Sequence, residues 1–79
     1  MVKAYILLKV KTGSEREVFE KLKKIPEIKD IHELYGDWDI IVKVESSKFE
    51  DMDKIITEGI RSIPDIKDSS TMMVAEYLK

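Results

Sequence analysis

Cysteine, asparagine and glutamine are absent from the 79 residues, and glycine, proline and histidine are scarce. Without cysteine the chain has no disulfide, no thiolate zinc site and no cysteine nucleophile, which suits a reducing compartment. No apolar run approaches the roughly 18 residues of a membrane span, and Met1 does not open a signal peptide. We therefore expect a soluble, cytoplasmic protein whose residues 1–79 form one domain, since chains of this length rarely form two cores.

A strong excess of either charge is also missing. The chain has 14 Lys and Arg against 16 Asp and Glu, a net charge of -2 with both signs interleaved. No basic stripe is available for phosphate backbones, so we expect no direct nucleic-acid binding. Charged residues make up 38% of the chain, weighted to Lys and Glu. Together with the missing amide side chains, this composition is typical of proteins from thermophiles.

Hydrophobic periodicity predicts alternating strands and helices. Each of two helices is expected to begin at a capping box, Ser14 with Glu17 and Ser47 with Glu50, and to end before a proline. The apolar positions expected on the two helices are Val18, Phe19, Leu22 and Ile25, then Phe49, Met52, Ile56, Gly59, Ile60 and Ile63. The expected strands are residues 2–10, 28–35, 38–45 and 69–78, with Gly36 and Asp37 closing a hairpin.

The two halves of the chain resemble each other. Ile25–Asp30 recurs as Ile63–Asp68, and Leu7–Val10 as Ile41–Val44. Either the halves share structural roles, or Ile-Pro-acid-Ile is simply effective helix-stop chemistry. Two strand-helix-strand units predict an α+β fold of order βαββαβ. Its usual closed form is ferredoxin-like, a four-stranded antiparallel sheet with two helices on one face.

The sheet face away from the helices should be polar if it meets water. It instead collects apolar side chains, so a second copy could bury on the order of 500 Å² of apolar surface per chain, roughly 12 kcal/mol before association costs. We expect a face-to-face homodimer, a dimeric α+β barrel; the alternative is a monomer with a lightly apolar exposed sheet. The expected interface residues are Tyr5, Leu7, Leu34 and Ile41, with alternate members of Met72, Met73, Val74 and Tyr77.

Catalytic patterns are weak. The single histidine, His32, has no serine, cysteine or second histidine at a motif spacing. Asp37 and Asp39 supply fewer oxygen ligands than a hard cation recruits. The glycines lack the spacing of a phosphate-binding loop. We predict no catalytic residue, no metal site and no cofactor.

Two polar clusters suit a zwitterion. A carboxylate such as Asp39 can hold an ammonium group, hydroxyls and turn N–H groups can hold a carboxylate, and Trp38 can wall an apolar side chain. The same residues also serve ordinary turns and strand starts. We expect the clusters at opposite ends of the subunit, roughly 20 Å apart, so that one site would have to be composite between subunits. The candidate ligand-binding residues are Tyr35, Gly36, Asp37, Trp38 and Asp39, then Ser69, Ser70 and Thr71.

Four segments together resemble the effector-binding (RAM) domain of Lrp/AsnC transcription regulators: Ala4–Val10, Gly36–Val44, Ile60–Ile66 and Ser69–Val74. The most specific feature is a glycine, two residues, an aspartate and an apolar strand, followed some thirty residues on by a Ser/Thr-rich strand start. The resemblance implies a βαββαβ subunit that dimerises through its sheets and assembles further, commonly into octamers, with an amino-acid effector bound between subunits. The hairpin and the hydroxyl residues of a neighbouring subunit would hold that effector.

The chain carries no N-terminal helix-turn-helix, so it resembles stand-alone RAM proteins with no DNA-binding domain. These sense amino acids or co-assemble with full-length Lrp/AsnC regulators. Tyr35 departs from the small hydroxyl residue common before the glycine. The alternative function is a small dimeric α+β barrel enzyme of the cofactor-independent monooxygenase or isomerase type. It needs a His, Asn, Trp or Arg in a cavity between sheet and helices, and the candidates are His32 and Trp38.

Overall fold

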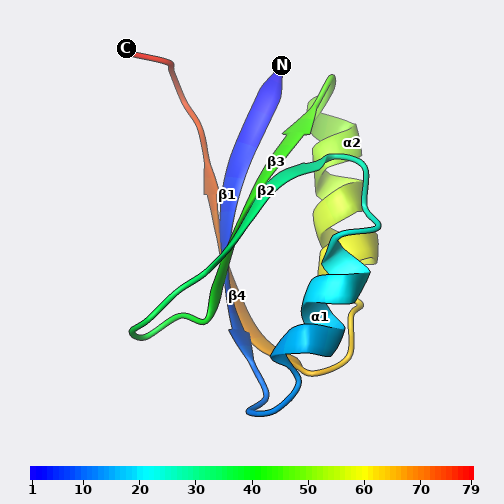
Figure 1. Ribbon diagram of the computed structural model, residues 1–79. Coiled ribbons are helices and arrows are strands. Elements are labelled where there is room, and N and C mark those ends of the chain that lie inside the picture. Colours follow the sequence, from blue (N-terminus) through cyan, green and yellow to red (C-terminus); the bar gives the residue numbers. More distant parts are fainter.

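Four strands form one antiparallel sheet in the computed structural model, which describes all residues from 1 to 79. The strands lie side by side in the order β2-β3-β1-β4, and both helical segments cover one face of the sheet (Figure 1). The α+β, βαββαβ ferredoxin-like fold is thereby confirmed. In chain order the elements are β1 (Val2–Val10), α1 (Glu15–Leu22), β2 (Ile28–Glu33), β3 (Ile40–Ser46), α2 (Phe49–Lys54), the π-helical η1 (Ile55–Ile60) and β4 (Ile66–Met73).

The core lies between the sheet and the helices. Alternate residues of β1 point to this side, and the antiparallel register sets Ala4, Ile6 and Leu8 opposite alternate residues of β3. The helices contribute apolar side chains at helical spacing, so both faces of the core are aliphatic. The buried residues are Ala4, Ile6, Leu8, Val10, Val18, Leu22, Ile40, Val42, Val44, Met52, Ile60 and Ile63.

Neither expected capping box forms. Ser14 has φ -104° and ψ 7° and makes no side-chain cap hydrogen bond; the Gly13 N–H instead donates to Oε2 of Glu15 (3.0 Å). At the second helix Lys48 occupies the N-cap, and the hydroxyl of Ser46 donates to the Lys48 carbonyl oxygen (3.0 Å). A capping serine requires extended backbone geometry, which the tight turn at Ser14 does not provide.

The helices also differ from their expected extents. α1 ends at Leu22 rather than just before Pro26. The second helix widens to a π-helix, in which the Arg61 N–H donates to the Ile56 carbonyl oxygen five residues back (2.8 Å). Phe49, expected on the apolar stripe, opens α2 and is 62% exposed. No helix has both the length and the apolar character needed to cross a membrane.

The strand boundaries also differ from those expected from the sequence. β2 stops at Glu33 and β3 starts at Ile40, so the hairpin loop is longer than expected. β4 begins three residues earlier than residue 69, because Ile66 already pairs with Val10. β4 ends at Met73 rather than at residue 78, and the Val74 N–H donates the last bond to the Lys3 carbonyl oxygen (2.9 Å).

The internal repeat corresponds to shared structural roles. Ile28 opens β2 and Ile66 opens β4. The residue before each strand accepts a backbone hydrogen bond from the adjacent strand: the Glu27 carbonyl oxygen from Glu45 (2.9 Å) and the Asp65 carbonyl oxygen from Lys11 (2.8 Å). Each proline segment therefore follows a helix and docks the next strand.

The hairpin and the start of β4 lie at the same end of the sheet, which contradicts the expected separation of about 20 Å. β2 runs parallel to β1, so the hairpin follows the end of β1, where β4 also begins (Figure 1). Leu8 has Ile40 on one side and Ser69 on the other. Two strand spacings therefore separate the clusters, about 10 Å. Topology alone no longer requires a site shared between subunits.

The sheet face away from the helices, called the open face, carries four apolar side chains: Tyr5, Leu7, Ile41 and Met72. They are neighbours across strands, because Leu7 pairs with Ile41 and Tyr5 with Met72. Tyr5 is 37% and Met72 45% exposed, and the other two are half-buried. Leu34, also expected at the interface, is half-buried at the end of β2.

Candidate functional site

The hairpin between β2 and β3 presents its polar residues to solvent. The Leu34 N–H donates to the Asp39 carbonyl oxygen (2.8 Å), which closes the loop. Gly36 has φ +117°, a conformation that residues with a Cβ rarely adopt, so a glycine is required at this turn. Tyr35, Gly36 and Asp37 are exposed, and the relative exposure of Tyr35 is 108%. One subunit therefore supplies no enclosure around the hairpin tip.

Asp39 joins the hairpin to β1. Its Oδ2 accepts a hydrogen bond from the Val10 N–H (2.7 Å), and its own N–H donates to the Leu8 carbonyl oxygen (2.9 Å). The carboxylate thus takes the place of a backbone carbonyl oxygen as the acceptor for the last N–H of β1. One carboxylate oxygen has this structural role, and Oδ1 has no hydrogen-bond partner in the subunit.

Lys9 is a site residue that the sequence pattern did not reveal. Its ammonium nitrogen lies 5.7 Å from the ring centroid of Trp38, within cation–π range. Lys9 is also opposite Asp68 in the β1–β4 register. The signal in the sequence was a lysine on the apolar outer face of β1, two residues after Leu7. A cation therefore lies beside the hairpin, at Trp38.

The hydroxyl cluster divides between the two sheet faces. Ser70 pairs with Leu7 and lies on the open face, whereas Ser69 and Thr71 pair with Leu8 and Ile6 on the helix side. The structure thus brings Ser70, Lys9 and Trp38 to the end of the sheet that Asp39 occupies. It does not bring Ser69 and Thr71 to the same face.

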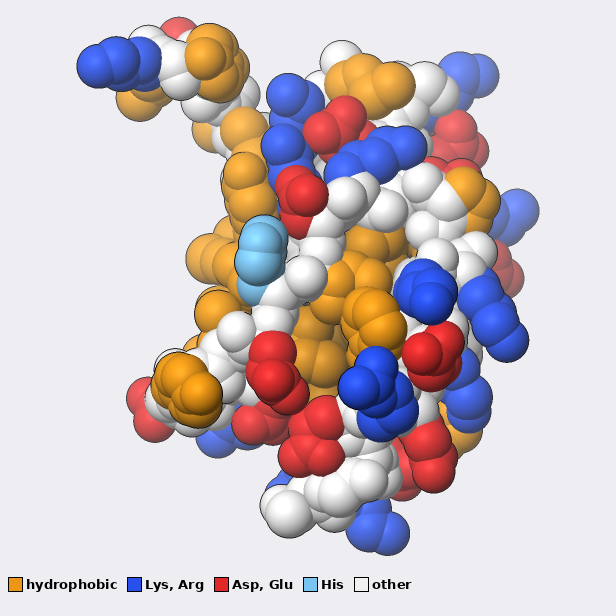
Figure 2. All heavy atoms as spheres, in the orientation of Figure 1, with side chains coloured by type: hydrophobic (Ala, Val, Ile, Leu, Met, Phe, Trp, Pro, Cys, Tyr) orange, Lys and Arg blue, Asp and Glu red, His pale blue; other side chains and the backbone are white.

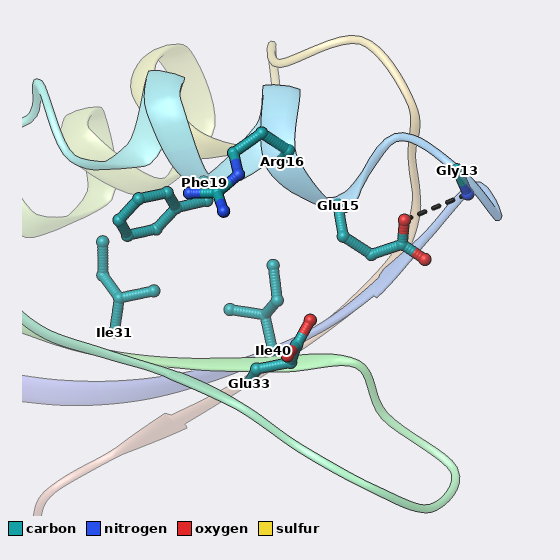
Figure 3. A pocket seen from close by; sticks show the side chains of 7 residues that line it. All are labelled: Gly13, Glu15, Arg16, Phe19, Ile31, Glu33 and Ile40. Atoms are coloured by element: carbon teal, nitrogen blue, oxygen red, sulfur yellow. Dashed lines mark hydrogen bonds between the residues drawn. The ribbon is translucent and has the colours of Figure 1, made fainter.

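A groove of about 500 Å³ opens between α1 and the β2–β3 pair (Figure 3). Ile31 and Ile40 point up from the sheet, Phe19 and Arg16 come from α1, and Glu33 lies at the foot of the hairpin. The two remaining lining residues are Gly13 and Glu15. No sequence motif pointed to this groove, because its walls meet only when α1 folds over the sheet.

The residues considered for catalysis do not line this groove. His32 pairs with Ile41 on the open face and lines a separate shallow hollow of about 250 Å³ there. Trp38 lies beside Lys9 at the hairpin. Among the residue types that the enzyme alternative requires, Arg16 is present in the groove. No three His, Asp or Glu side chains gather as a metal ion would require.

Comparison with solved structures shows first which known proteins share the fold of this chain. A transcriptional regulator from Neisseria meningitidis, NMB0573, whose structure is an L-Met complex, shares the fold with a TM-score of 0.87 at 19% identity. The alignment covers 99% of this chain and 52% of that one. FFRP-DM1 is 49% identical with a TM-score of 0.90, over 94% of this chain and 99% of that chain.

The family follows from the sequence. The family model described as the Lrp/AsnC ligand binding domain matches residues 3–79, so the chain belongs to this family. The HTH-type transcriptional regulator FL11 of Pyrococcus horikoshii is 39% identical over 76 residues, which cover 96% of this chain and 50% of FL11. The chain thus spans about half the length of this regulator. The thermophile-like composition agrees with relatives from Pyrococcus.

Proposed function

We propose that this chain is a stand-alone amino-acid-binding module that acts on transcription through protein partners and catalyses no reaction. The observation that carries the proposal is the match of a regulator's ligand-binding domain to residues 3–79. The similarity to FFRP-DM1, 49% identical over nearly the whole of both chains, supports a shared role for this domain. The similarity to NMB0573, whose structure contains L-Met, supports an amino-acid effector.

The effector would bind at the hairpin end of the open face. The free Oδ1 of Asp39 and the exposed Asp37 can hold an ammonium group. Lys9 and Ser70 can hold a carboxylate, since both lie on the open face beside the hairpin. Trp38 would wall the side chain, and turn N–H groups at Gly36 would add donors. Ser69 and Thr71 lie on the helix side of the sheet, so in this proposal they would contribute from a subunit of another dimer.

A second copy would complete this site. The apolar open face is the natural dimer surface, and the hairpin with its exposed Tyr35 lies at its edge. A monomer of this mass should expose about 4,900 Å², whereas the isolated subunit exposes 5653 Å². We propose a homodimer through Tyr5, Leu7, Leu34 and Ile41 that assembles into a higher oligomer, up to an octamer. Full-length Lrp/AsnC regulators in the cytoplasm would be its protein partners.

Guanidinium unfolding in the presence of each of the twenty amino acids tests the proposal, since heat-stable chains resist a simple melt. An effector at one hundred times its Kd should add about 2.7 kcal/mol to the free energy of unfolding. Asp39→Asn keeps an oxygen acceptor for the Val10 N–H but removes the charge, so most of this gain should disappear. Asp53→Asn, an exposed change on α2, is the matched control. Twenty unchanged midpoints for the unaltered protein would end the proposal.

A further inference from the structure

Charges of opposite sign lie on opposite walls of the groove beneath α1. Arg16 projects from the first turns of α1, and Glu33 from the end of β2 (Figure 3). Neither side chain has an ion-pair partner, since the two ion pairs of the molecule are Lys23–Glu20 and Lys43–Glu45. Both charges are therefore free to meet a ligand's charges.

The floor between these charges is apolar. Ile31 and Ile40 form it from the sheet, and Phe19 closes one end. Figure 2 shows this floor as a hollow of hydrophobic atoms between the sheet and the helices, with acidic and basic side chains around its rim. Small-molecule sites combine an apolar surface with polar groups that fix orientation, and this groove offers three apolar and three charged side chains. The volume of about 500 Å³ lies within the range of about 300–1,000 Å³ found for such sites.

The side chain of Arg16 lies against the ring of Phe19. Its guanidinium carbon lies 5.9 Å from the ring centroid of Phe19, so the ring supports one side of the group and leaves its N–H edge free. A guanidinium presents parallel donors that match the two oxygens of a carboxylate. Glu15 is the less available acid, because its Oε2 accepts from the Gly13 N–H (3.0 Å). Glu33 is thus the acceptor that remains for an ammonium group.

From this geometry we propose a second ligand site in each subunit, the α1 groove, which takes an α-amino acid with an uncharged apolar side chain. Arg16 binds the carboxylate, Glu33 binds the ammonium group, and the side chain lies on Ile31 and Ile40. The rim carries two carboxylates and one guanidinium, so a further negative charge on the ligand is disfavoured. L-Leucine fits this description, and L-glutamate does not.

The α1 groove is distinct from the hairpin site. It opens on the helix side of the sheet, whereas the open face lies on the other side, so a sheet-to-sheet dimer leaves it accessible (Figure 1). It adjoins the hairpin only through Glu33 and Ile40, the residues at the two ends of the loop. The proposal does not depend on ligand binding at the hairpin.

Methyl NMR on the full oligomer tests the α1 groove, with isoleucine δ1 methyl groups labelled. Titration with L-leucine should shift the Ile31 and Ile40 signals saturably, with half-saturation below about 1 mM, and leave Ile41 on the open face unmoved. 4-Methylpentanoate, which lacks the ammonium group, and 3-methylbutylamine, which lacks the carboxylate, should each bind at least about tenfold more weakly. L-Glutamate should produce no shift at Ile31.

Two variants separate the α1 groove from the hairpin. Arg16→Gln should weaken the Ile31 response at least about tenfold, while Lys21→Gln, which removes one positive charge from the same helix, should not. The Trp38 indole N–H reports the hairpin site in the same samples. If L-leucine shifts Trp38 but not Ile31, or if Arg16→Gln leaves the Ile31 titration unchanged, the α1 groove is not a site. A shift at Ile31 without one at Trp38 would keep the groove and count against the hairpin.

Discussion

Asp39 has a structural role in addition to the binding role proposed for it. Sequence reasoning assigned it to an effector's ammonium group, whereas in the structure Oδ2 accepts from the Val10 N–H at 2.7 Å. Val10 is buried and ends β1, so the amide would otherwise lie unpaired at the sheet margin. The carboxylate therefore fixes the hairpin against β1 and leaves Oδ1 for a ligand. Its two roles can be separated by substitution.

Removing the Asp39 acceptor should destabilise the fold without any ligand. A part-buried N–H that loses a charged acceptor costs about 1–3 kcal/mol. Asp39→Ala should lower the free energy of unfolding by that amount, and Asp39→Asn by less because an amide oxygen remains. Guanidinium unfolding at one fixed protein concentration measures this, since dimer stability depends on concentration. Asp37→Ala, at an exposed position without a hydrogen-bond partner, should change little; an equal loss there would refute the assignment.

At the scale of elements, the second helix departs most from a regular pattern. Apolar residues at helical spacing predicted one continuous α-helix, but the chain widens to π-helix over Ile55–Ile60. The wider turn still buries Ile60, and it sets Gly59 against Ile25, three residues beyond the end of α1. A π-turn shifts the following side chains around the helix axis, which the apolar spacing of the sequence does not predict.

Gly59 offers a stabilising substitution. A Cβ there would lie 3.6 Å from Cδ1 of Ile25, an ordinary van der Waals contact, and the backbone is helical. Gly59→Ala should raise the free energy of unfolding by about 0.5–1 kcal/mol, because alanine loses less backbone entropy on folding. Urea or guanidinium midpoints report the change.

Gly36→Ala is the opposite case and serves as the control. Nothing lies within 4 Å of a Cβ at Gly36, so space is not limiting, but φ is +117°. The strained backbone should cost about 1–2 kcal/mol. A neutral Gly36→Ala together with a harmful Gly59→Ala would contradict both local geometries.

At the scale of the molecule, the sheet has one face covered by a layer of helices and an open face that carries an apolar patch. The helix side buries twelve residues in a single cluster. The open face leaves Tyr5 and Met72 well exposed beside Leu7 and Ile41. A subunit of this size buries a modest part of its chain's surface, and a second sheet on the open face would remove more apolar area from water.

A charge on the open face should therefore reduce the assembly. Leu7→Lys or Ile41→Lys would place an ammonium group in the centre of the proposed interface, where desolvation without a partner costs several kcal/mol. Light scattering should then give a lower mass than for the unaltered protein. Thr57→Lys adds the same charge on the exposed helical side and should leave the mass unchanged. An unaltered mass for both sheet variants would contradict the sheet-to-sheet dimer.

The sequence by itself determined the elements and their order. Period-2 alternation over Val2–Val10 and apolar spacing in the helices predicted which side chains form the core, because burial depends first on periodicity. The repeated Ile-Pro-acid-Ile segments predicted where helices give way to strands, since proline chemistry is local. Both capping boxes failed, because a cap depends on the backbone angles of the preceding turn, which sequence spacing does not specify.

Only the tertiary structure decided which polar groups meet. The hairpin and the start of β4 proved to share one end of the sheet, with β1 and Lys9 between them. Arg16 and Glu33, seventeen residues apart in sequence, face each other across a groove that exists because α1 folds over the β2–β3 pair. Such sites arise from strand order and helix placement. These are long-range pairings, and no local pattern of residues encodes them.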